Sequence, residues 1–375
     1  MELTLESVIT VKHYIEALEM CMKGVSSKHS VQNYRRHALH HIAEAIETIR
    51  KGELPPVRHK GEIEIKERGK SRLITPITIE DRVTQRVICE YALIPALEKK
   101  LIYDNGASAK GKGTHFSRRR LNGFLETAKR RWGPENIWAL QFDFSGYFAS
   151  IPHAECWRVL DEAFEDKHLR DLAMGIIESY AADKIEAIED PDEHDRMMAK
   201  LRRHELKGIC LGSQISQIMA LAVPNPVDHL IKDKLGCEFY TRHMDDGIIL
   251  LDSRERLEEI KEAIKKEAEN HGLVLNPKKT RIVRFKEGFT FLKVRYRADG
   301  YKTIRTIAKT SVVRQRRKLK KFGPKLCAGA MTEEDVKASM VSWKASTRGT
   351  RSFRRIRAMQ KKYRAVLEEH KNEIL

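Results

Sequence analysis

The sequence predicts an α+β fold in which short antiparallel strands lie among helices and a basic helical region follows them. Alternating or short apolar segments at 61–79, 137–144, 237–251 and 280–297 are typical of strands. Two of these segments contain a central turn signal, which favours antiparallel hairpins. Residues 308–375 combine helical apolar spacing with many Lys and Arg residues. The sequence therefore predicts both strands and helices, as an α+β fold requires.

Length and composition favour a soluble protein of two or three packed units. The chain has 375 residues, of which 41% are hydrophobic and 33% are charged. No apolar run approaches the roughly 20 residues that span a membrane, and the N-terminus lacks the pattern of a signal peptide. The six cysteines are scattered without a C-x-x-C pair, which argues against a disulfide framework or a zinc site and favours the cytoplasm.

Positive charge is concentrated near the C-terminus. The net charge is +18, and residues 301–375 contain 21 Lys and Arg against 6 Asp and Glu. Such a block usually faces a polyanion, although a solvated tail is the simpler alternative. The stretch "SFRRIRAMQKKYRAVL" favours a folded helix with one cationic face, because its apolar residues have helical spacing: Phe353, Ile356, Met359, Tyr363, Val366 and Leu367.

The remaining segments are assigned by their apolar spacing and their turn residues. Helices are expected within residues 1–52, 80–101, 154–186, 213–235 and 253–271. The Gly, Lys and Ser-rich stretch 104–118 predicts a loop, and the charged stretch 183–208 predicts an exposed connector or insertion. A short strand is expected at 273–275.

Three aspartates lie in apolar surroundings. Asp245 and Asp246 separate the β-prone segments "CEFYT" and "GIILL", and Asp143 ends the strand-like "LQFDF". A lone Asp-Asp pair is most often a turn or a helix cap. Partly buried carboxylates that lie close together need a compensating cation, and oxygen ligands suit Mg²⁺. Two Mg²⁺ ions about 3.5–4 Å apart can support phosphoryl transfer.

Six motifs in order over residues 66–297 resemble those of the reverse transcriptase family. They are "GKSRLITP", "QFDFSGYFASIPH", "GICLGSQISQ", "TRHMDD", "GLVLNPKKTRI" and "FTFLKVRY". The resemblance implies a right-hand polymerase with fingers, an antiparallel-sheet palm and a basic helical thumb. It places an N-terminal helical extension at 1–57, interleaved fingers and palm at 58–300, and the thumb at 301–375.

The resemblance also implies a catalytic centre. Asp143, Asp245 and Asp246 fall on the family's ligands for two Mg²⁺ ions, with Mn²⁺ as an alternative. Lys279 falls where the family carries a lysine near the leaving pyrophosphate, and Lys278 is a rival for that role. The motif "TRHMDD" departs from the family pattern, because His243 stands where tyrosine is usual.

Further residues resemble the family's nucleotide site. Lys70 and Arg72 would hold the triphosphate from one face of a strand, although an ordinary surface pair is the alternative. Phe148 falls where a bulky aromatic excludes a 2′-hydroxyl, with core packing as the alternative. The other nucleotide-binding positions implied by the motifs are Phe144, Gly212 and Gln217.

Two stretches resemble the reverse transcriptases of diversity-generating retroelements. Leu211 precedes Gly212 where group II intron and retroviral enzymes usually carry glutamine, and "YDNGASAKGKGTHFSRRRL" is similar to a segment that follows the fingers in these retroelement enzymes. This subtype implies error-prone copying in a bacterium or phage. The alternatives are an antiphage or unclassified reverse transcriptase, template-independent synthesis, and a non-catalytic RNA-binding protein.

The resemblance implies a set of partners. They are an RNA template, a DNA or RNA primer, the RNA–DNA hybrid, deoxynucleoside triphosphates and a small basic accessory protein, with no membrane. An A-form hybrid would be recognised through its backbone and shape, which fits a thumb rich in Lys and Arg.

Overall fold

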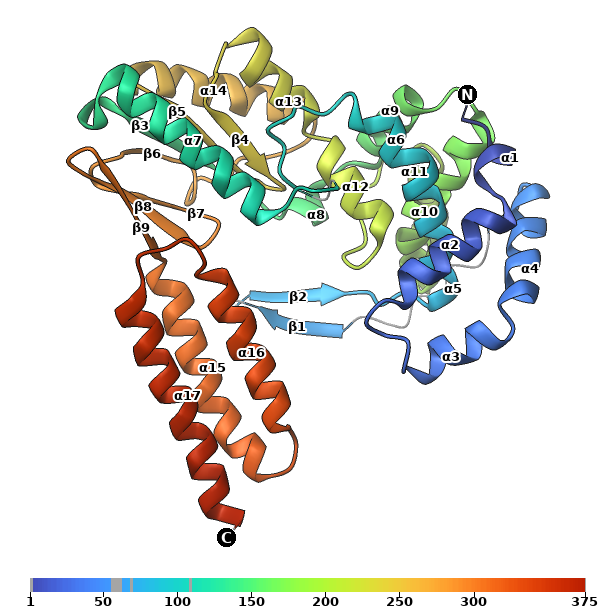
Figure 1. Ribbon diagram of the computed structural model, residues 1–375. Helices are drawn as coiled ribbons and strands as arrows, with labels where there is room; N and C mark the ends of the chain where they lie inside the picture. The colour runs from blue at the N-terminus through green and yellow to red at the C-terminus, as the bar shows by residue number, and fades with distance from the viewer. Residues whose placement is uncertain (1–2, 55–62, 68–69, 108–109, 375) are drawn as a thin grey trace. The chain divides into compact units, whose positions relative to one another are not determined.

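The computed structural model describes residues 3–54, 63–67, 70–107 and 110–374 (Figure 1). The predicted α+β fold class is confirmed. Within these residues the strands form a two-stranded sheet, a four-stranded sheet of order β4-β5-β3-β6, and a three-stranded sheet of order β7-β8-β9. The pairs β1–β2, β3–β6, β7–β8 and β8–β9 are antiparallel.

The N-terminal region is helical, as predicted. Thr10 caps the second helix, because its side chain accepts a hydrogen bond from the His13 amide at 3.2 Å. The last helix ends before Gly52, which adopts a φ of 78°. The helices are α1 (Leu5–Val8), α2 (Val11–Met22), α3 (His29–Arg36) and α4 (Ala38–Arg50).

A hairpin and a helical segment follow. Strands β1 (Ile63–Glu67) and β2 (Lys70–Ile74) pair in register, and the predicted turn at Gly69 lies outside the described residues. The helical segment consists of α5 (Ile79–Ile88), the π-helix η1 (Cys89–Leu93) and α6 (Ile94–Glu98). Pro95 lies in the first turn of α6 and cannot donate a backbone hydrogen bond, which explains the interruption.

The four-stranded sheet is built from β4 (Tyr240–His243), β5 (Asp246–Leu251), β3 (Trp138–Phe142) and β6 (Arg281–Arg284). Its strands carry apolar residues on both faces, and Ile248, Ile249 and Leu250 are fully buried. Gly247 lies against the ring of Phe142, because a Cβ atom there would be 2.2 Å from the ring. A side chain at residue 247 would displace Phe142, the residue before Asp143.

The remaining predicted helices are present. They are α9 (His153–Ala163), α10 (Lys167–Glu186), α12 (Gln214–Ala222), α13 (Asn225–His229), the π-helix η3 (Leu230–Lys234) and α14 (Arg254–Asn270). The short helix α8 (Tyr147–Ser150) was not predicted. Ser213 caps α12 by accepting a hydrogen bond from the Ser216 amide at 3.3 Å. The helical segment 213–235 is interrupted near Pro224 and Pro226, as the sequence predicted.

Two local predictions were wrong, and a third was incomplete. Helix α7 (Thr114–Trp132) begins inside the stretch 104–118 that was expected to be a loop. The stretch 183–208 is mostly exposed, as expected, but it contains helix α11 (Pro191–Arg202), which Asp190 caps through the Asp192 amide at 3.0 Å. Residues 273–275 form no strand and make a single bridge between Phe144 and Leu275.

The three-stranded sheet has a clear alternation. Its strands are β7 (Phe289–Phe291), β8 (Val294–Asp299) and β9 (Lys302–Ile307). In β8 the residues Val294, Tyr296 and Ala298 are buried while their neighbours are exposed. The strand pair predicted at 280–297 therefore becomes β6 plus the first two strands of this sheet.

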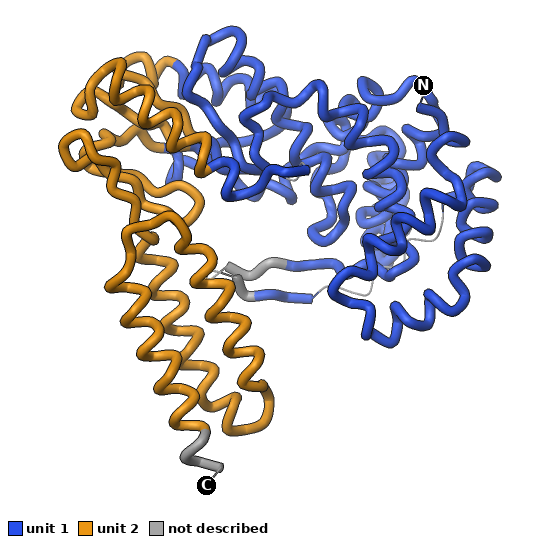
Figure 2. Tube along the Cα trace, viewed as in Figure 1, with its two compact units in different colours: residues 1–117, 142–247, 260–280 blue, residues 118–141, 248–259, 281–375 orange. Residues whose placement is uncertain are grey.

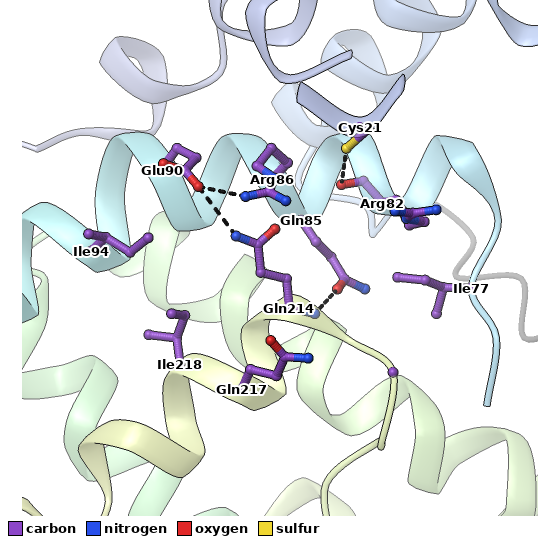
Figure 3. Close-up of a pocket in the computed structure, with 11 residues that line it drawn as sticks. Cys21, Ile77, Arg82, Gln85, Arg86, Glu90, Ile94, Gln214, Gln217 and Ile218 are labelled. Atoms are coloured by element: carbon purple, nitrogen blue, oxygen red, sulfur yellow. Dashed lines mark hydrogen bonds and ion pairs between the residues drawn. The ribbon is translucent and has the colours of Figure 1, made fainter. Parts of the chain in front are cut away.

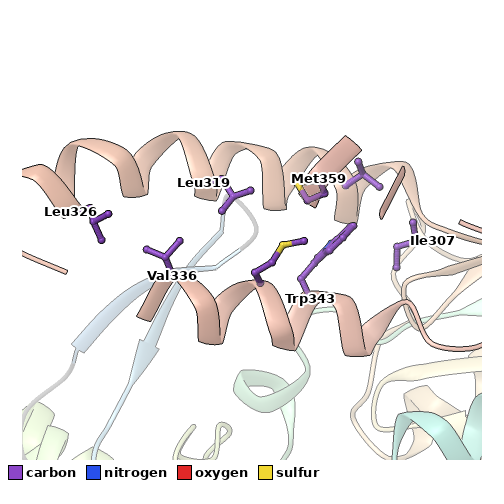
Figure 4. Close-up of a cluster of buried hydrophobic side chains, with 8 residues drawn as sticks. Ile307, Leu319, Leu326, Val336, Trp343 and Met359 are labelled. Atoms are coloured by element: carbon purple, nitrogen blue, oxygen red, sulfur yellow. The ribbon is translucent and has the colours of Figure 1, made fainter. Parts of the chain in front are cut away.

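A basic helical bundle ends the chain, as predicted. It contains α15 (Lys309–Cys327), α16 (Glu333–Ser346) and α17 (Phe353–Ile374). Figure 4 shows its buried core, which includes Leu319, Leu326, Val336, Trp343 and Met359. One expected core residue is wrong, since Phe353 begins α17 and is 80% exposed.

The chain forms two compact units, coloured separately in Figure 2. Unit 1 comprises residues 1–117, 142–247 and 260–280, and unit 2 comprises 118–141, 248–259 and 281–375. All of the residues predicted to take part in catalysis belong to unit 1. No helix in the described ranges has the length and apolarity needed to cross a membrane.

Candidate active site

The predicted hairpin carries the aspartate pair at its tip. Strands β4 and β5 are joined by two residues, Met244 and Asp245, and Asp246 begins β5. Two-residue hairpins need a positive φ, which Gly or Asn usually supplies. Here Met244 adopts a φ of 56°. A non-glycine residue in this region costs roughly 1 kcal/mol, so the neighbouring structure must hold the turn.

Asp143 follows strand β3, and backbone hydrogen bonds join Asp143 and Ser145 to the segment 273–276. The Asn276 amide donates to the Asp143 carbonyl oxygen at 2.7 Å, and the Ser145 amide donates to the Val274 carbonyl oxygen at 2.8 Å. The Asp143 side chain is 3% exposed. The segment 273–276 therefore holds Asp143 without forming a regular strand.

The same segment brings a lysine to Asp143. The Lys279 amide donates to the Asn276 carbonyl oxygen at 3.1 Å, which closes a turn. The Lys279 ammonium then contacts the Asp143 carboxylate through Oδ2. Oδ1 of Asp143 is buried and has no hydrogen-bond partner among the described residues. The lysine that contacts Asp143 is therefore Lys279, while the Lys278 amide donates to the Asn276 side chain.

The three carboxylates interact electrostatically. Burial raises the pKa of Asp246 to about 7, and the negative charges of Asp245 and Asp143 add to the rise. The Lys279 ammonium opposes the rise only in part. Asp143 lies about a hundred residues before Asp245 and Asp246 in the sequence. The fold nevertheless brings the three carboxylates close enough for their charges to interact.

The chemistry of this site fits a hard divalent cation. The described ranges hold no group of three His, Cys, Asp or Glu side chains already spaced around a metal. The donors at the site are nevertheless carboxylate oxygens, which suit Mg²⁺. A cation would also give the orphaned Oδ1 of Asp143 the partner that a buried carboxylate oxygen needs. The three aspartates therefore fit Mg²⁺.

A buried ion pair supports the hairpin that carries Asp245 and Asp246. Arg242 in β4 and Asp228 in α13 are both fully buried, and the Arg242 Nη2 atom lies 2.6 Å from Asp228 Oδ2. Tyr240 donates a hydrogen bond to the same carboxylate at 2.6 Å. Sequence reasoning missed this pair. A charged residue inside the apolar strand segment "FYTRH" was the available signal, because a buried charge needs a partner.

His243 ends β4 and contacts the stretch 104–118. Its Nδ1 atom is 3.2 Å from the Ser117 Oγ atom and 3.2 Å from the Gly106 carbonyl oxygen. The Gly106 amide donates to the Arg242 carbonyl oxygen at 2.9 Å, and Asn105 forms a parallel bridge with Arg242. Part of the stretch 104–118 therefore runs beside β4 and supports the hairpin that carries Asp245 and Asp246.

A pocket of about 310 Å³ contains two of the predicted nucleotide-binding residues, Gly212 and Gln217 (Figure 3). Gly212 adopts a φ of 138°, and a Cβ atom there would lie 2.7 Å from the Thr75 carbonyl oxygen. The backbone of Gly212 therefore lies close to that of Thr75, where a side chain would not fit. Gln85 shapes the pocket, because its Oε1 atom accepts hydrogen bonds from the Ser213 hydroxyl at 2.8 Å and the Gln214 amide at 3.1 Å.

The other predicted nucleotide-binding residues lie in two places. Lys70 and Arg72 belong to β2, two residues apart, and their side chains lie outside the described part of the structure. Phe144 is buried and stacks on Tyr147 with ring centroids 5.4 Å apart. Phe148, in α8, is half-buried and meets Tyr147 edge to face at 5.9 Å. Of the two phenylalanines, Phe148 retains an exposed surface.

Comparisons with known proteins give one family. The family model described as "Reverse transcriptase (RNA-dependent DNA polymerase)" matches residues 58–296. A search of curated proteins finds no match.

Solved structures of similar fold include two yeast telomerases. Telomerase from Candida albicans, in complex with a TWJ fragment of telomeric RNA, is 13% identical with a TM-score of 0.47, over 86% of this chain and 56% of that chain. Apo telomerase from Candida tropicalis is 14% identical with a TM-score of 0.44, over 92% of this chain and 63% of that chain. The chain therefore spans less than two thirds of the telomerase chains that it matches.

Proposed function

Because the chain belongs to the reverse transcriptase family, we propose that it is an RNA-directed DNA polymerase that copies an RNA template into complementary DNA. One observation supports this most strongly. Asp143 has a buried carboxylate oxygen with no hydrogen-bond partner among the described residues. The negative charges of Asp143 and Asp245 also act on the carboxylate of Asp246. A buried cluster of like charges costs free energy, and a nucleotidyl transferase needs such a cluster to hold cations.

The proposed mechanism assigns the carboxylates to metal binding. Asp143, Asp245 and Asp246 would hold two Mg²⁺ ions, which when bound activate the primer 3′-hydroxyl and neutralise charge on the triphosphate. Lys279 balances the Asp143 charge in the metal-free protein. During the reaction the Lys279 ammonium would give a proton to the leaving pyrophosphate.

Binding of the deoxynucleoside triphosphate is assigned to residues of β2, of α8 and of the stretch 212–217. Lys70 and Arg72 are two apart in β2, which places them on one face of the strand, where they hold the phosphates. Phe148 presents a partly exposed ring that excludes a 2′-hydroxyl. Gly212 and Gln217 line the pocket that receives the template and the paired base.

A primer-extension assay tests the proposal. The full chain with an RNA template, a primer and labelled deoxynucleoside triphosphates should make template-length DNA in Mg²⁺. Asp245→Ala together with Asp246→Ala should abolish synthesis. The matched control is Asp252→Ala, which removes an exposed carboxylate just after β5 and should leave synthesis unchanged.

Two outcomes of the same assay contradict the proposal. Synthesis without template would indicate a template-independent polymerase. RNA binding without synthesis in either Mg²⁺ or Mn²⁺ would indicate a non-catalytic RNA-binding protein that retains the fold.

The subtype that we propose is the error-prone reverse transcriptase of a diversity-generating retroelement, which works with a small basic accessory protein. Leu211 in place of the usual glutamine supports it, since residue 211 directly precedes the close approach of Gly212 to Thr75. Sequencing of the product should reveal errors concentrated opposite template adenines. Uniform fidelity at all four template bases would favour an antiphage or unclassified reverse transcriptase instead.

A further inference from the structure

We propose that Arg242 is a positioning residue, which holds the catalytic turn through the Met244 carbonyl oxygen and so fixes the direction of Asp245. This inference rests on the proposed function, because it takes Asp245 and Asp246 to be the metal-binding pair. It concerns a residue that contacts neither metal nor nucleotide in the proposed mechanism.

The Arg242 guanidinium is fully enclosed. It forms a two-point contact with Asp228, in which Nε donates to Oδ1 at 2.8 Å and Nη2 donates to Oδ2 at 2.6 Å. Both side chains have no exposed surface. Such a fork fixes the plane of the guanidinium, so its remaining N–H groups point in set directions.

Those remaining groups join separate segments. Nη2 also donates to the Leu221 carbonyl oxygen in α12 at 2.9 Å, and Nη1 donates to the Met244 carbonyl oxygen at 2.8 Å. Met244 is the residue with a φ of 56°, directly before Asp245. One guanidinium therefore links α13, the end of α12 and the strained turn.

Fold stability alone gives no reason for this arrangement. A buried ion pair is often no more stabilising than well-packed apolar residues of the same volume. Apolar residues, however, could not donate to the Met244 carbonyl oxygen. The turn also lacks the glycine or asparagine that usually makes a positive φ easy. The contact that distinguishes Arg242 from an apolar residue is thus the one that reaches the catalytic turn.

The test compares two variants that disturb the same network. Arg242→Lys keeps a positive charge but loses the fork, and its single ammonium cannot serve Asp228, Leu221 and Met244 together. Tyr240→Phe is the matched control, because it removes one hydrogen bond to Asp228 and leaves the Arg242 contacts in place. In primer extension we expect kcat of Arg242→Lys to fall at least tenfold, with KM for the nucleotide within twofold. Tyr240→Phe should stay within threefold in both.

A rescue separates positioning from loss of stability. Glycine adopts a positive φ without strain, so Met244→Gly reduces the need for the guanidinium. We expect Met244→Gly in the Arg242→Lys background to recover at least threefold of the lost kcat. A variant that is only less stable would gain nothing in kcat from this change.

Hydrogen–deuterium exchange keeps the inference independent of catalysis. Peptides that cover residues 240–251 of Arg242→Lys should exchange at least fivefold faster than in the wild type, while peptides from α15–α17 should be unchanged. Wild-type protein that makes no DNA would overturn the proposed function, and this exchange result would still decide the role of Arg242. Unchanged exchange in 240–251, or a wild-type kcat in Arg242→Lys, would overturn the inference.

Discussion

Two hairpins of this protein solve the same backbone problem with different chemistry. The β4–β5 hairpin in unit 1 turns at Met244, and the β7–β8 hairpin in unit 2 turns at Leu292 and Lys293, with φ values of 56°, 46° and 70°. None of these residues is glycine or asparagine. In each hairpin a buried arginine donates to the carbonyl oxygen of a positive-φ residue: Arg242 to Met244, and Arg118 to Leu292.

The two arginines differ in their partners. Arg242 faces the carboxylate of Asp228, which raises the Arg242 pKa despite burial. Arg118 donates to carbonyl oxygens, at 3.1 Å to Leu292 and 3.2 Å to Ser346, and burial lowers its pKa. The β4–β5 turn is therefore held by a charge-compensated fork, and the β7–β8 turn by neutral acceptors.

The difference indicates what each hairpin must do. A carboxylate fixes both the plane and the position of a guanidinium, whereas carbonyl oxygens tolerate more variation in angle. Under the proposed function, Asp245 and Asp246 must hold metal ions at defined places. The β7–β8 hairpin carries none of the residues assigned to the proposed site. The stronger support belongs to the hairpin that carries Asp245 and Asp246.

The largest effect is expected from Asp228→Asn, which leaves the Arg242 charge buried without compensation. Breaking a buried ion pair on one side costs about 3–5 kcal/mol, so the midpoint of urea unfolding should shift strongly. The double variant Arg242→Met with Asp228→Leu should recover most of that stability and still make little DNA. Full activity in the stable double variant would show that the fork serves packing alone.

The three carboxylates of the candidate site were accessible to sequence reasoning because carboxylates rarely interrupt apolar strands. Asp143, Asp245 and Asp246 each stood out against such a strand, and the order of the motifs added the rest. The helices and most strands followed from apolar spacing. Helix α11 was missed because its residues are mostly charged, although Asp190 and Pro191 form a readable helix start.

The supports of the site could not be predicted in the same way. Arg242 and Asp228 are 14 residues apart and lie in different elements, so no local periodicity relates them. The segment at Asn105 runs beside β4, yet its Asp-Asn-Gly composition is that of a turn. Such contacts depend on how the chain packs after its elements have formed. Sequence patterns predict individual helices and strands but say little about which of them contact each other in the fold.

A smaller effect is expected from Arg118→Lys in the second hairpin. Lysine cannot donate to Leu292 and Ser346 together, so one buried carbonyl oxygen would lose its partner, at a cost of about 1–3 kcal/mol. Thermal unfolding of the full chain measures this change. A destabilisation as large as that of Asp228→Asn would contradict the proposed difference between the two supports. The matched control is Arg119→Lys, one residue further along α7, where the side chain is exposed.

A gain in stability is expected from Lys293→Gly. Two-residue hairpin turns favour glycine at their second central residue, because glycine adopts a positive φ without strain. Relief of the strain at a φ of 70° should stabilise the hairpin by about 0.5–1 kcal/mol, measured by urea unfolding. The gain should be larger in the Arg118→Lys background, where the arginine no longer holds the turn. An equal gain in both backgrounds would indicate that Arg118 does not act on the turn.

The smallest expected effect is on the pH dependence of stability. It distinguishes contacts made by an arginine, such as Arg242, from a contact made by a histidine. His271 precedes the segment that holds Asp143, and its Nδ1 atom lies 2.9 Å from Glu155 Oε2. The hydrogen bond to Glu155 raises the His271 pKa, and the contacts of Glu155 with His271 and Arg158 outweigh burial and lower the Glu155 pKa.

A raised histidine pKa contributes stability that is complete below about pH 6.5 and is lost as pH rises through the folded-state pKa. A lowered glutamate pKa contributes stability that is present above about pH 4.5 and is lost as pH falls through the folded-state pKa. The pair should therefore stabilise most between these limits, by less than about 1 kcal/mol. The free energy of unfolding should be measured from pH 5 to pH 9. The wild type should lose the stabilisation by His271 as pH rises, and His271→Gln should not show this loss. The Arg242 support should show no such dependence, because arginine stays charged throughout. An unchanged pH profile in His271→Gln would assign the dependence to other groups.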